Sequence, residues 1–297
     1  MADSSTLQEW VAWTFSPAIS AILLTLLISL LSPILIHTYL YRSAASKELP
    51  TFLLIGPSGS GKTSLLTLFS NGTPAPTHIS QEPQTALCQL PSSTRSSEDR
   101  YRSENDTSSR HQPKFLLLDT PGHGKLRHHA LTSLTSPKAL RGILFVVDSA
   151  SVSSATGMTE TAEYLHDVLL VLQKRHTQSK SSKGPQQIPV LVAANKQDVF
   201  TSLPAGLVKT RLEQEVGRVR ETKSKGLLDS GIGMDDDDDA GGDEETNWLG
   251  QYGSKEFKLA QMEEHGLDIR VLGGNVKGEG KEKGKVEEWW AWVGENL

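Results

Sequence analysis

The sequence has a single cysteine, no excess of positive charge and no internal repeat. Cys88 is the only cysteine among 297 residues, so an intramolecular disulfide is excluded and a reducing compartment is compatible with the chain. The formal net charge is −5, which argues against a general nucleic-acid-binding protein, so no direct nucleic-acid partner is expected.

Charged residues are also missing from one long apolar segment near the N-terminus. Residues 18–40, "AISAILLTLLISLLSPILIHTYL", contain no Asp, Glu, Lys or Arg and are long enough to cross a bilayer as one helix. A cleavable signal peptide is the alternative, but its apolar region would be shorter and its leading segment basic. Here Asp3 and Glu9 precede the apolar segment, and no Lys or Arg does. The pattern therefore favours one membrane-spanning helix.

The charges that follow this segment predict its orientation. Arg42 and Lys47 lie just after it, so the positive-inside rule places the preceding residues outside the cytosol and the remainder inside. The predicted parts are a short lumenal N-terminus (1–17), a transmembrane helix (18–40), a linker (41–50) and a cytosolic domain (51–297).

In the predicted cytosolic domain, apolar runs typical of strands alternate with segments typical of helices. This alternation predicts an α/β fold with a mostly parallel sheet covered by helices on both faces. The six predicted strands are 51–55, 85–90 (an edge strand), 114–119, 142–148, 189–195 and 268–272. The predicted helices are 62–70, 160–174, 205–220 and 286–295, the last a Trp-rich segment that we expect to pack on the sheet. Three polar stretches are predicted to be disordered surface insertions, at 92–112, 177–187 and 229–246.

A glycine-rich stretch, "GPSGSGKT" (56–63), stands between the first predicted strand and the first predicted helix. This context and the G-x-x-x-x-G-K-S/T spacing are those of a phosphate-binding loop. Its backbone amides and the helix N-terminus favour phosphate, Lys62 adds positive charge between two phosphates, and the Thr63 hydroxyl can ligate Mg²⁺. The candidate nucleotide-binding residues here are Gly56, Pro57, Ser58, Gly59, Ser60, Gly61, Lys62, Thr63 and Ser64.

Two further motifs follow later predicted strands. In "DTPGH" (119–123), Asp119 can hold the water shell of Mg²⁺ and the Gly122 amide can meet the γ-phosphate. In "NKQD" (195–198), the Asp198 carboxylate can accept two hydrogen bonds from guanine that adenine cannot provide, which can reject the wrong base by ~10⁴. We expect Asn195 to orient this loop and the Lys196 stem to lie over the purine.

The three motifs, in this order and strand context, resemble those of the small GTPase superfamily over residues 51–297. "ILFVVDSA" (143–150) and "NKQD" resemble the Arf/Sar branch. "DTPGHGKLR" (119–127), "RLEQEVGRVRETKSKGL" (211–227), "WLGQYGSKEFKLAQ" (248–261) and the apolar N-terminal segment are similar to the β subunits of the signal recognition particle receptor. The predicted fold is thus a P-loop GTPase domain preceded by one transmembrane helix.

The resemblance also implies ligands, partners and a location. It implies GTP or GDP with Mg²⁺, a partner in the receptor's α subunit, and a single-pass position in the endoplasmic reticulum membrane that brings ribosomes to the translocation channel. Two alternatives stay open: an Arf/Sar-like GTPase of membrane trafficking, and a structural anchor that holds nucleotide without turnover. A permanent span argues against the first, because cycling on and off a bilayer needs a reversible anchor.

Some family positions are less well defined in this sequence. The loop that supports the base is expected at 273–278, "GGNVKG", where the Gly274 amide is the candidate contact. For the Mg²⁺ threonine of the first switch, Thr77 is the candidate and Thr85 the alternative. His123 stands where many relatives have a glutamine that orients the attacking water, and is the candidate catalytic residue. It could orient water itself, leave hydrolysis slow until a partner helps, or be a surface histidine.

Overall fold

The computed structural model describes residues 26–34, 36, 49–97, 112–135, 140–178, 187–229, 248–278 and 284–297. The chain divides into two compact units, Met1–Glu48 and Leu49–Leu297. In the first unit residues 26–34 are helical. No helix in the described part of the chain is both long and apolar enough to cross a bilayer. The rest of the predicted span, the predicted lumenal N-terminus and most of the predicted linker lie outside the described residues.

The second unit is built on a six-stranded sheet in the order β2-β3-β1-β4-β5-β6. Its strands are β1 (Thr51–Ile55), β2 (Gln84–Gln89), β3 (Lys114–Asp119), β4 (Leu140–Asp148), β5 (Ile188–Asn195) and β6 (Leu267–Gly273). Only the edge strand β2 runs antiparallel to its neighbour; every other pair in this sheet is parallel. The predicted mostly parallel six-stranded sheet with an edge strand near 85–90 is confirmed.

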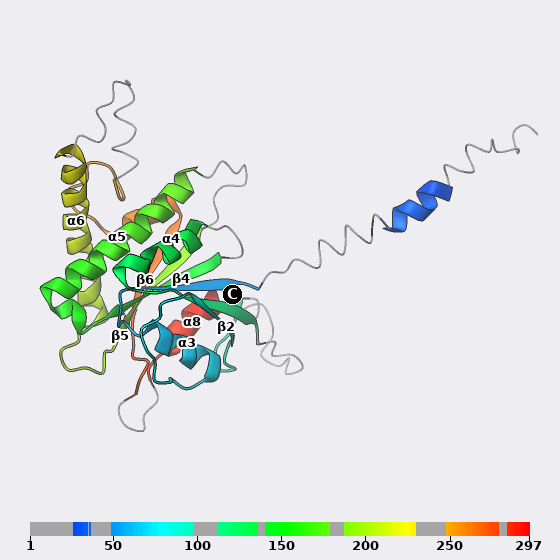
Figure 1. Ribbon diagram of the computed structural model, residues 1–297, viewed down its shortest axis with the longest axis horizontal. Coiled ribbons are helices and arrows are strands. Elements are labelled where there is room, and N and C mark those ends of the chain that lie inside the picture. The colour runs from blue at the N-terminus through cyan, green and yellow to red at the C-terminus, as the bar shows by residue number, and fades with distance from the viewer. Residues whose placement is uncertain are drawn as a thin grey trace, which may run out of the picture. The chain divides into compact units, whose positions relative to one another are not determined.

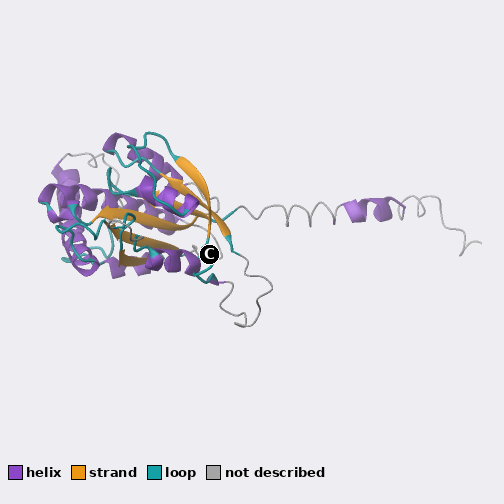
Figure 2. Ribbon diagram, turned by 90° about the horizontal axis from the view of Figure 1, so that it is seen from below, coloured by secondary structure: helices purple, strands orange, loops and turns teal. Residues whose placement is uncertain are grey.

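Helices cover both faces of this sheet (Figures 1 and 2). The α-helices are α3 (Lys62–Asn71), α4 (Arg127–Thr135), α5 (Ala155–Gln178), α6 (Ala205–Asp229) and α8 (Glu287–Glu295), and the short 3-10 helices are η3 (Gly124–Leu126), η4 (Ser151–Ser153) and η5 (Leu259–His265). In Figure 1, α4, α5 and α6 lie on one side of the sheet and α3 and α8 on the other.

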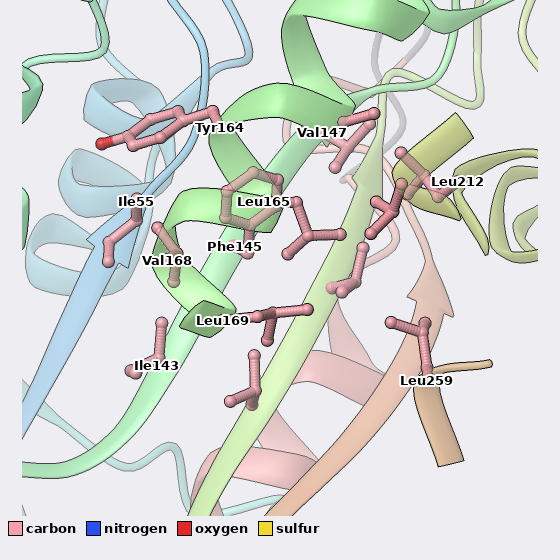
Figure 3. Packing of buried hydrophobic residues seen from close by; sticks show 14 of the residues in the cluster. Ile55, Ile143, Phe145, Val147, Tyr164, Leu165, Val168, Leu169, Leu212 and Leu259 are labelled. Carbon is pink, nitrogen blue, oxygen red and sulfur yellow. The ribbon is translucent and has the colours of Figure 1, made fainter. Parts of the chain in front are cut away.

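The central strands β1, β4 and β5 are mostly apolar because both of their faces are buried. In β1, Leu53 and Ile55 join the core beneath α4, α5 and α6, whereas Phe52 and Leu54 join the core beneath α3 and α8. Figure 3 shows the first of these cores, where Phe145 of β4 packs beside residues of α5. This two-sided burial fixes the carboxyl ends of the parallel strands along one edge, where ligands bind in such folds.

The Trp-rich C-terminal segment packs as predicted. Trp289 and Trp292 of α8 are buried in the core shared with α3. Trp290 stacks on Phe69 of α3 with ring centroids 3.7 Å apart. The aromatic residues therefore hold α8 against the helix that follows the phosphate loop.

The helix α4 was not predicted from the sequence. Only Ala130 and Leu134, one turn apart, are buried in this helix, so its sequence shows no apolar stripe. The long helices α5 and α6 run beyond their predicted ends, to Gln178 and Asp229. Most of each predicted insertion, namely residues 98–111, 179–186 and 230–246, lies outside the described residues.

Candidate nucleotide-binding site

The glycine-rich loop connects the end of β1 directly to the start of α3. The Lys62 side chain turns back over this loop, and its Nζ donates hydrogen bonds to the carbonyl oxygens of Gly56 (2.8 Å) and Pro57 (2.9 Å). Lys62 is only 5% exposed. This burial lowers the pKa of its ammonium to about 8, although the nearby Asp119 carboxylate acts in the opposite direction. The loop thus holds a buried amino group next to two of its own backbone carbonyl oxygens.

Hydroxyl groups and one carboxylate meet next to the lysine. Asp119 ends β3, the neighbour of β1, and its Oδ2 accepts a hydrogen bond from the Thr63 hydroxyl at 2.6 Å. Thr77 Oγ1 and Ser64 Oγ lie 3.0 Å apart. Burial raises the pKa of Asp119, opposed by the Thr63 hydrogen bond, the Lys62 charge and the Thr120 amide. The cause is the loss of water around the carboxylate.

These groups fit a hard cation that keeps part of its water shell. Asp119 Oδ1 is buried and accepts no hydrogen bond from any described residue. This oxygen could therefore ligate a cation directly or accept a hydrogen bond from a water molecule bound to the cation. The described residues contain no cluster of three or more His, Cys, Asp or Glu side chains that could hold a metal. Mg²⁺ suits this arrangement, because it is usually bound by one or two protein oxygens together with phosphate and water.

Asn195 joins the phosphate loop to the loop after β6. Its Nδ2 donates to the Ser60 carbonyl at 2.8 Å, and its Oδ1 accepts from the Val276 amide at 3.0 Å. The Gly274 amide donates to the Ala194 carbonyl at 2.9 Å. One side chain therefore fixes both ends of the site relative to each other.

These loops surround a pocket of about 310 Å³. Eleven of the residues predicted from the sequence line it: Ser58, Gly59, Gly61, Lys62, Thr63, Ser64, Thr77, Gly122, Asn195, Lys196 and Asp198. The structure adds His78, Ile79, Ser80, Val199, Val276 and Lys277 to this lining. Five other predicted residues do not line the pocket and lie in its supporting loops and strand end: Gly56, Pro57, Ser60, Asp119 and Gly274. At the expected base-supporting loop, Val276 and Lys277 face the pocket in place of Gly274.

Two other candidates lie away from the lining. His123 is exposed, and its Nδ1 accepts a hydrogen bond from the Lys125 amide at 3.3 Å, which caps η3. Its catalytic role stays a prediction. Thr85 lies in the edge strand β2, opposite Leu118, so of the two switch threonines only Thr77 reaches the pocket.

Two polar residues at strand ends had not been identified from the sequence. Thr120 follows β3, and its Oγ1 donates to the Leu54 carbonyl at 2.7 Å, tying the loop after β3 to β1. Asp148 ends β4, and its Oδ2 lies 2.6 Å from Lys196 Nζ. The signal that could have revealed both is a polar residue at the carboxyl end of a buried strand, where ligand sites of this fold gather.

The arrangement defines the class of protein. A phosphate loop after β1, a buried carboxylate at the end of β3 and the "NKQD" loop after β5 meet at the carboxyl edge of one mostly parallel sheet. This is the construction of a P-loop GTPase domain.

Comparison with known proteins identifies the family within this class. The chain belongs to the signal recognition particle receptor beta subunit family, whose model matches residues 47–265. It is 32% identical to the signal recognition particle receptor subunit beta of Saccharomyces cerevisiae over 250 residues, which cover 84% of each chain. The human subunit beta is 30% identical over 220 residues, covering 74% of this chain and 68% of that protein.

Solved structures show the same relationship. The signal recognition particle receptor SRb-GTP/SRX complex from Chaetomium thermophilum matches with a TM-score of 0.67 and 37% identity, covering 84% of this chain and 100% of that chain. The SRb-GDP-Mg structure from the same organism matches with a TM-score of 0.59 and 40% identity, covering 84% and 99%.

Proposed function

We propose that this chain is the membrane-anchored, GTP-binding subunit of a signal recognition particle receptor. In this role it holds the receptor's α subunit at the endoplasmic reticulum during co-translational targeting. The observation that carries the proposal is the pair of hydrogen bonds that Asn195 makes with Ser60 and Val276. These bonds join the phosphate-binding loop to the expected base-supporting loop around one pocket. Membership of the family supports it, and the Chaetomium thermophilum relative is described as a complex of SRb with GTP and SRX.

The proposed ligand is GTP or GDP with Mg²⁺, in line with the GTP, GDP and GDP-Mg forms of the Chaetomium thermophilum protein. Lys62 and the loop amides would bind the phosphates. Thr63 and Thr77 would supply hydroxyl ligands for Mg²⁺, with Asp119 holding its water. Bound Mg²⁺ neutralises negative charge on the β- and γ-phosphates. Asp198 would read the guanine edge.

The proposed switch lies beside the lysine. Gly122 lines the pocket, and a side chain there would come within 2.5 Å of Lys62 Nζ, so its backbone sits close to the phosphate position. Only a third phosphate could engage both the Gly122 amide and the segment that carries Thr77. The α subunit would recognise the ordered form of these loops, and the coupling expected for such a switch is ~1–3 kcal/mol, or ~5- to 150-fold in affinity.

Calorimetry with the N-terminal domain of the α subunit tests this switch. We expect tighter binding to the chain loaded with a non-hydrolysable GTP analogue than to the GDP form. Equal affinity for both forms would favour the structural anchor. Competition between GTP and ATP tests the ligand itself, and equal affinity for the two would reject the guanine-specific site.

The membrane anchor rests on residues 18–40, which contain no Asp, Glu, Lys or Arg. We propose that they span the bilayer once, with residues 1–17 in the lumen and residues 51–297 in the cytosol, where contact with the ribosome or translocation channel can occur. Two sequences, "NGT" (71–73) and "NDT" (105–107), would be glycosylated only in the lumen. Both should stay unmodified in cells. A mobility shift after glycosidase treatment would show that the orientation in the membrane is the opposite of the proposed one.

A further inference from the structure

We propose that Asp148 is a positioning residue for the base of the bound nucleotide: it fixes the Lys196 side chain without touching the nucleotide. This inference rests on the proposed function as a guanine-nucleotide-binding site and deepens it. Asp148 is not one of the described residues that line the pocket, whereas Lys196 is.

The sheet brings the two residues together. In the parallel pair of β4 and β5, Asp148 lies opposite Asn195, the residue before Lys196. The Ser149 amide donates to the Asn195 carbonyl at 3.0 Å, which continues the pairing beyond the end of β4. Residues that are 48 positions apart in the chain are therefore neighbours at the carboxyl edge of the sheet.

The backbone of Lys196 turns in an unusual conformation. Its φ of 62° makes it the only described non-glycine residue with positive φ. Such a conformation persists where surrounding contacts fix it, and it is concentrated at functional sites. Here the Gln197 amide donates to the Gly274 carbonyl at 3.2 Å, and the Val199 amide donates to the Lys196 carbonyl at 3.1 Å. The backbone direction of the lysine is thus set by the loop.

Asp148 fixes the other end of the lysine. Its Oδ2 lies 2.6 Å from Lys196 Nζ, and its Oδ1 accepts hydrogen bonds from the amides of Ala150 (3.0 Å) and Ser151 (3.2 Å). The Asp148 side chain is 17% exposed and that of Lys196 38%. Because both carboxylate oxygens are engaged, the carboxylate is an immobile partner for a long, rotatable stem.

A stem held at both ends forms a fixed surface in the pocket. The aliphatic part of Lys196 is expected to cover the purine face, and a contact with a face does not distinguish bases by their edge groups. Asp198 would read those edge groups. Asp148 should therefore govern the affinity for purine nucleotides in general, and Asp198 the choice among them.

The test compares the affinities of the purified full-length chain for GDP and IDP, measured by competition. Asp148→Asn keeps an oxygen for the Ala150 and Ser151 amides but removes the charge that holds Lys196. We expect it to weaken GDP and IDP equally, by about fivefold, which is the scale of a partly exposed ion pair. The GDP to IDP ratio should not change. Lys196→Met should cause the same loss.

A double-mutant cycle separates positioning from a general structural role. The variant with both changes should bind GDP no more weakly than either single variant, because each removes the same interaction. Glu295→Gln is the matched control, since it removes a 2.7 Å ion pair with Arg270 between α8 and β6, and it should leave both affinities unchanged.

Three outcomes would overturn the inference: additive losses in the double variant, a changed GDP to IDP ratio, or unaltered GDP binding by both single variants. If Asp148→Asn does not fold, unaltered GDP binding by Lys196→Met alone overturns it. If the unmodified chain does not bind guanine nucleotide, the proposed function fails first, so the two failures are distinguishable.

Discussion

The two ends of the pocket are built in different ways. The phosphate end is one continuous segment, in which a strand, a loop and a helix start follow each other and Lys62 bonds to carbonyls five and six residues away. The base end combines residues from three separate strand ends, and Asn195 bonds across 135 positions to Ser60 and across 81 to Val276. A local motif can thus specify phosphate binding, whereas base selection requires the assembled sheet.

The largest expected effect is at the base end. Asp198→Asn should change the base preference from guanine to xanthine, because the amide can donate a hydrogen bond to the O2 that replaces the guanine amino group. Sites built to hydrogen-bond such groups discriminate by ~10⁴. Competition between GDP and XDP measures the change. Unaltered selectivity in a folded variant would remove Asp198 from the base site.

At the phosphate end, Lys62→Ala should reduce triphosphate affinity by ~10- to 100-fold, the scale of one or two charged hydrogen bonds. The affinity is measured by titration with a labelled GTP analogue, and the control is the thermal unfolding midpoint. The midpoint should change little in comparison. A variant that loses stability as severely as affinity would show that the lysine serves the loop and not the nucleotide.

The link between the two ends can be broken at a glycine. Gly61 has φ 98°, and a Cβ there would come within 2.4 Å of Asn195 Nδ2. Gly59 has φ 76° but has no atom within 4 Å of such a Cβ. Gly59→Ala should cost about 1–2 kcal/mol of unfolding free energy from backbone strain alone, and Gly61→Ala about 2–4 kcal/mol. Chemical denaturation gives both values, and equal losses would mean that the contact with Asn195 adds nothing.

The Mg²⁺ site offers another matched pair. Thr77→Val removes a hydroxyl from the pocket, and Thr85→Val changes an exposed residue of β2. We expect the first to weaken Mg²⁺-dependent GTP binding about tenfold, as for the loss of one strong polar contact, and the second to have no effect. The comparison is made with Mg²⁺ and with EDTA. A larger effect of Thr85→Val than of Thr77→Val would show that Thr85 is the threonine that binds Mg²⁺.

The smallest effect is a pH dependence specific to the phosphate end. The pKa of Lys62 is about 8 against an ordinary 10.5, so the ammonium loses its proton in the mildly alkaline range. Phosphate favours the charged form, so nucleotide affinity should fall about fourfold between about pH 7 and 8.5. Lys62→Met should abolish this dependence. The same shift has the opposite effect on folding: stability rises from about pH 8 to 10.5, because the unfolded chain then binds the additional proton.

Local sequence alone determined most of the fold and the phosphate end. The strands at 51–55 and 114–119 were predicted with their observed bounds, because buried parallel strands are continuous apolar runs with polar ends. The loop at 56–63 was recognisable because its glycines, Lys62 and Thr63 form one contiguous motif directly before a helix, so no contact with a distant part of the chain is needed to identify it. The helix α4 was missed because its two buried residues give no periodic signal.

Only the tertiary structure decided how the base end is assembled. No spacing in the sequence indicates that Asp148 holds Lys196, or that Val276 and Lys277 line the pocket in place of Gly274. These relations follow from strand order and register, since β4, β5 and β6 pair in parallel and bring their carboxyl ends to one edge of a sheet that is packed on both faces. Contacts between residues far apart in the chain depend on that packing, and the local sequence around each residue does not contain it.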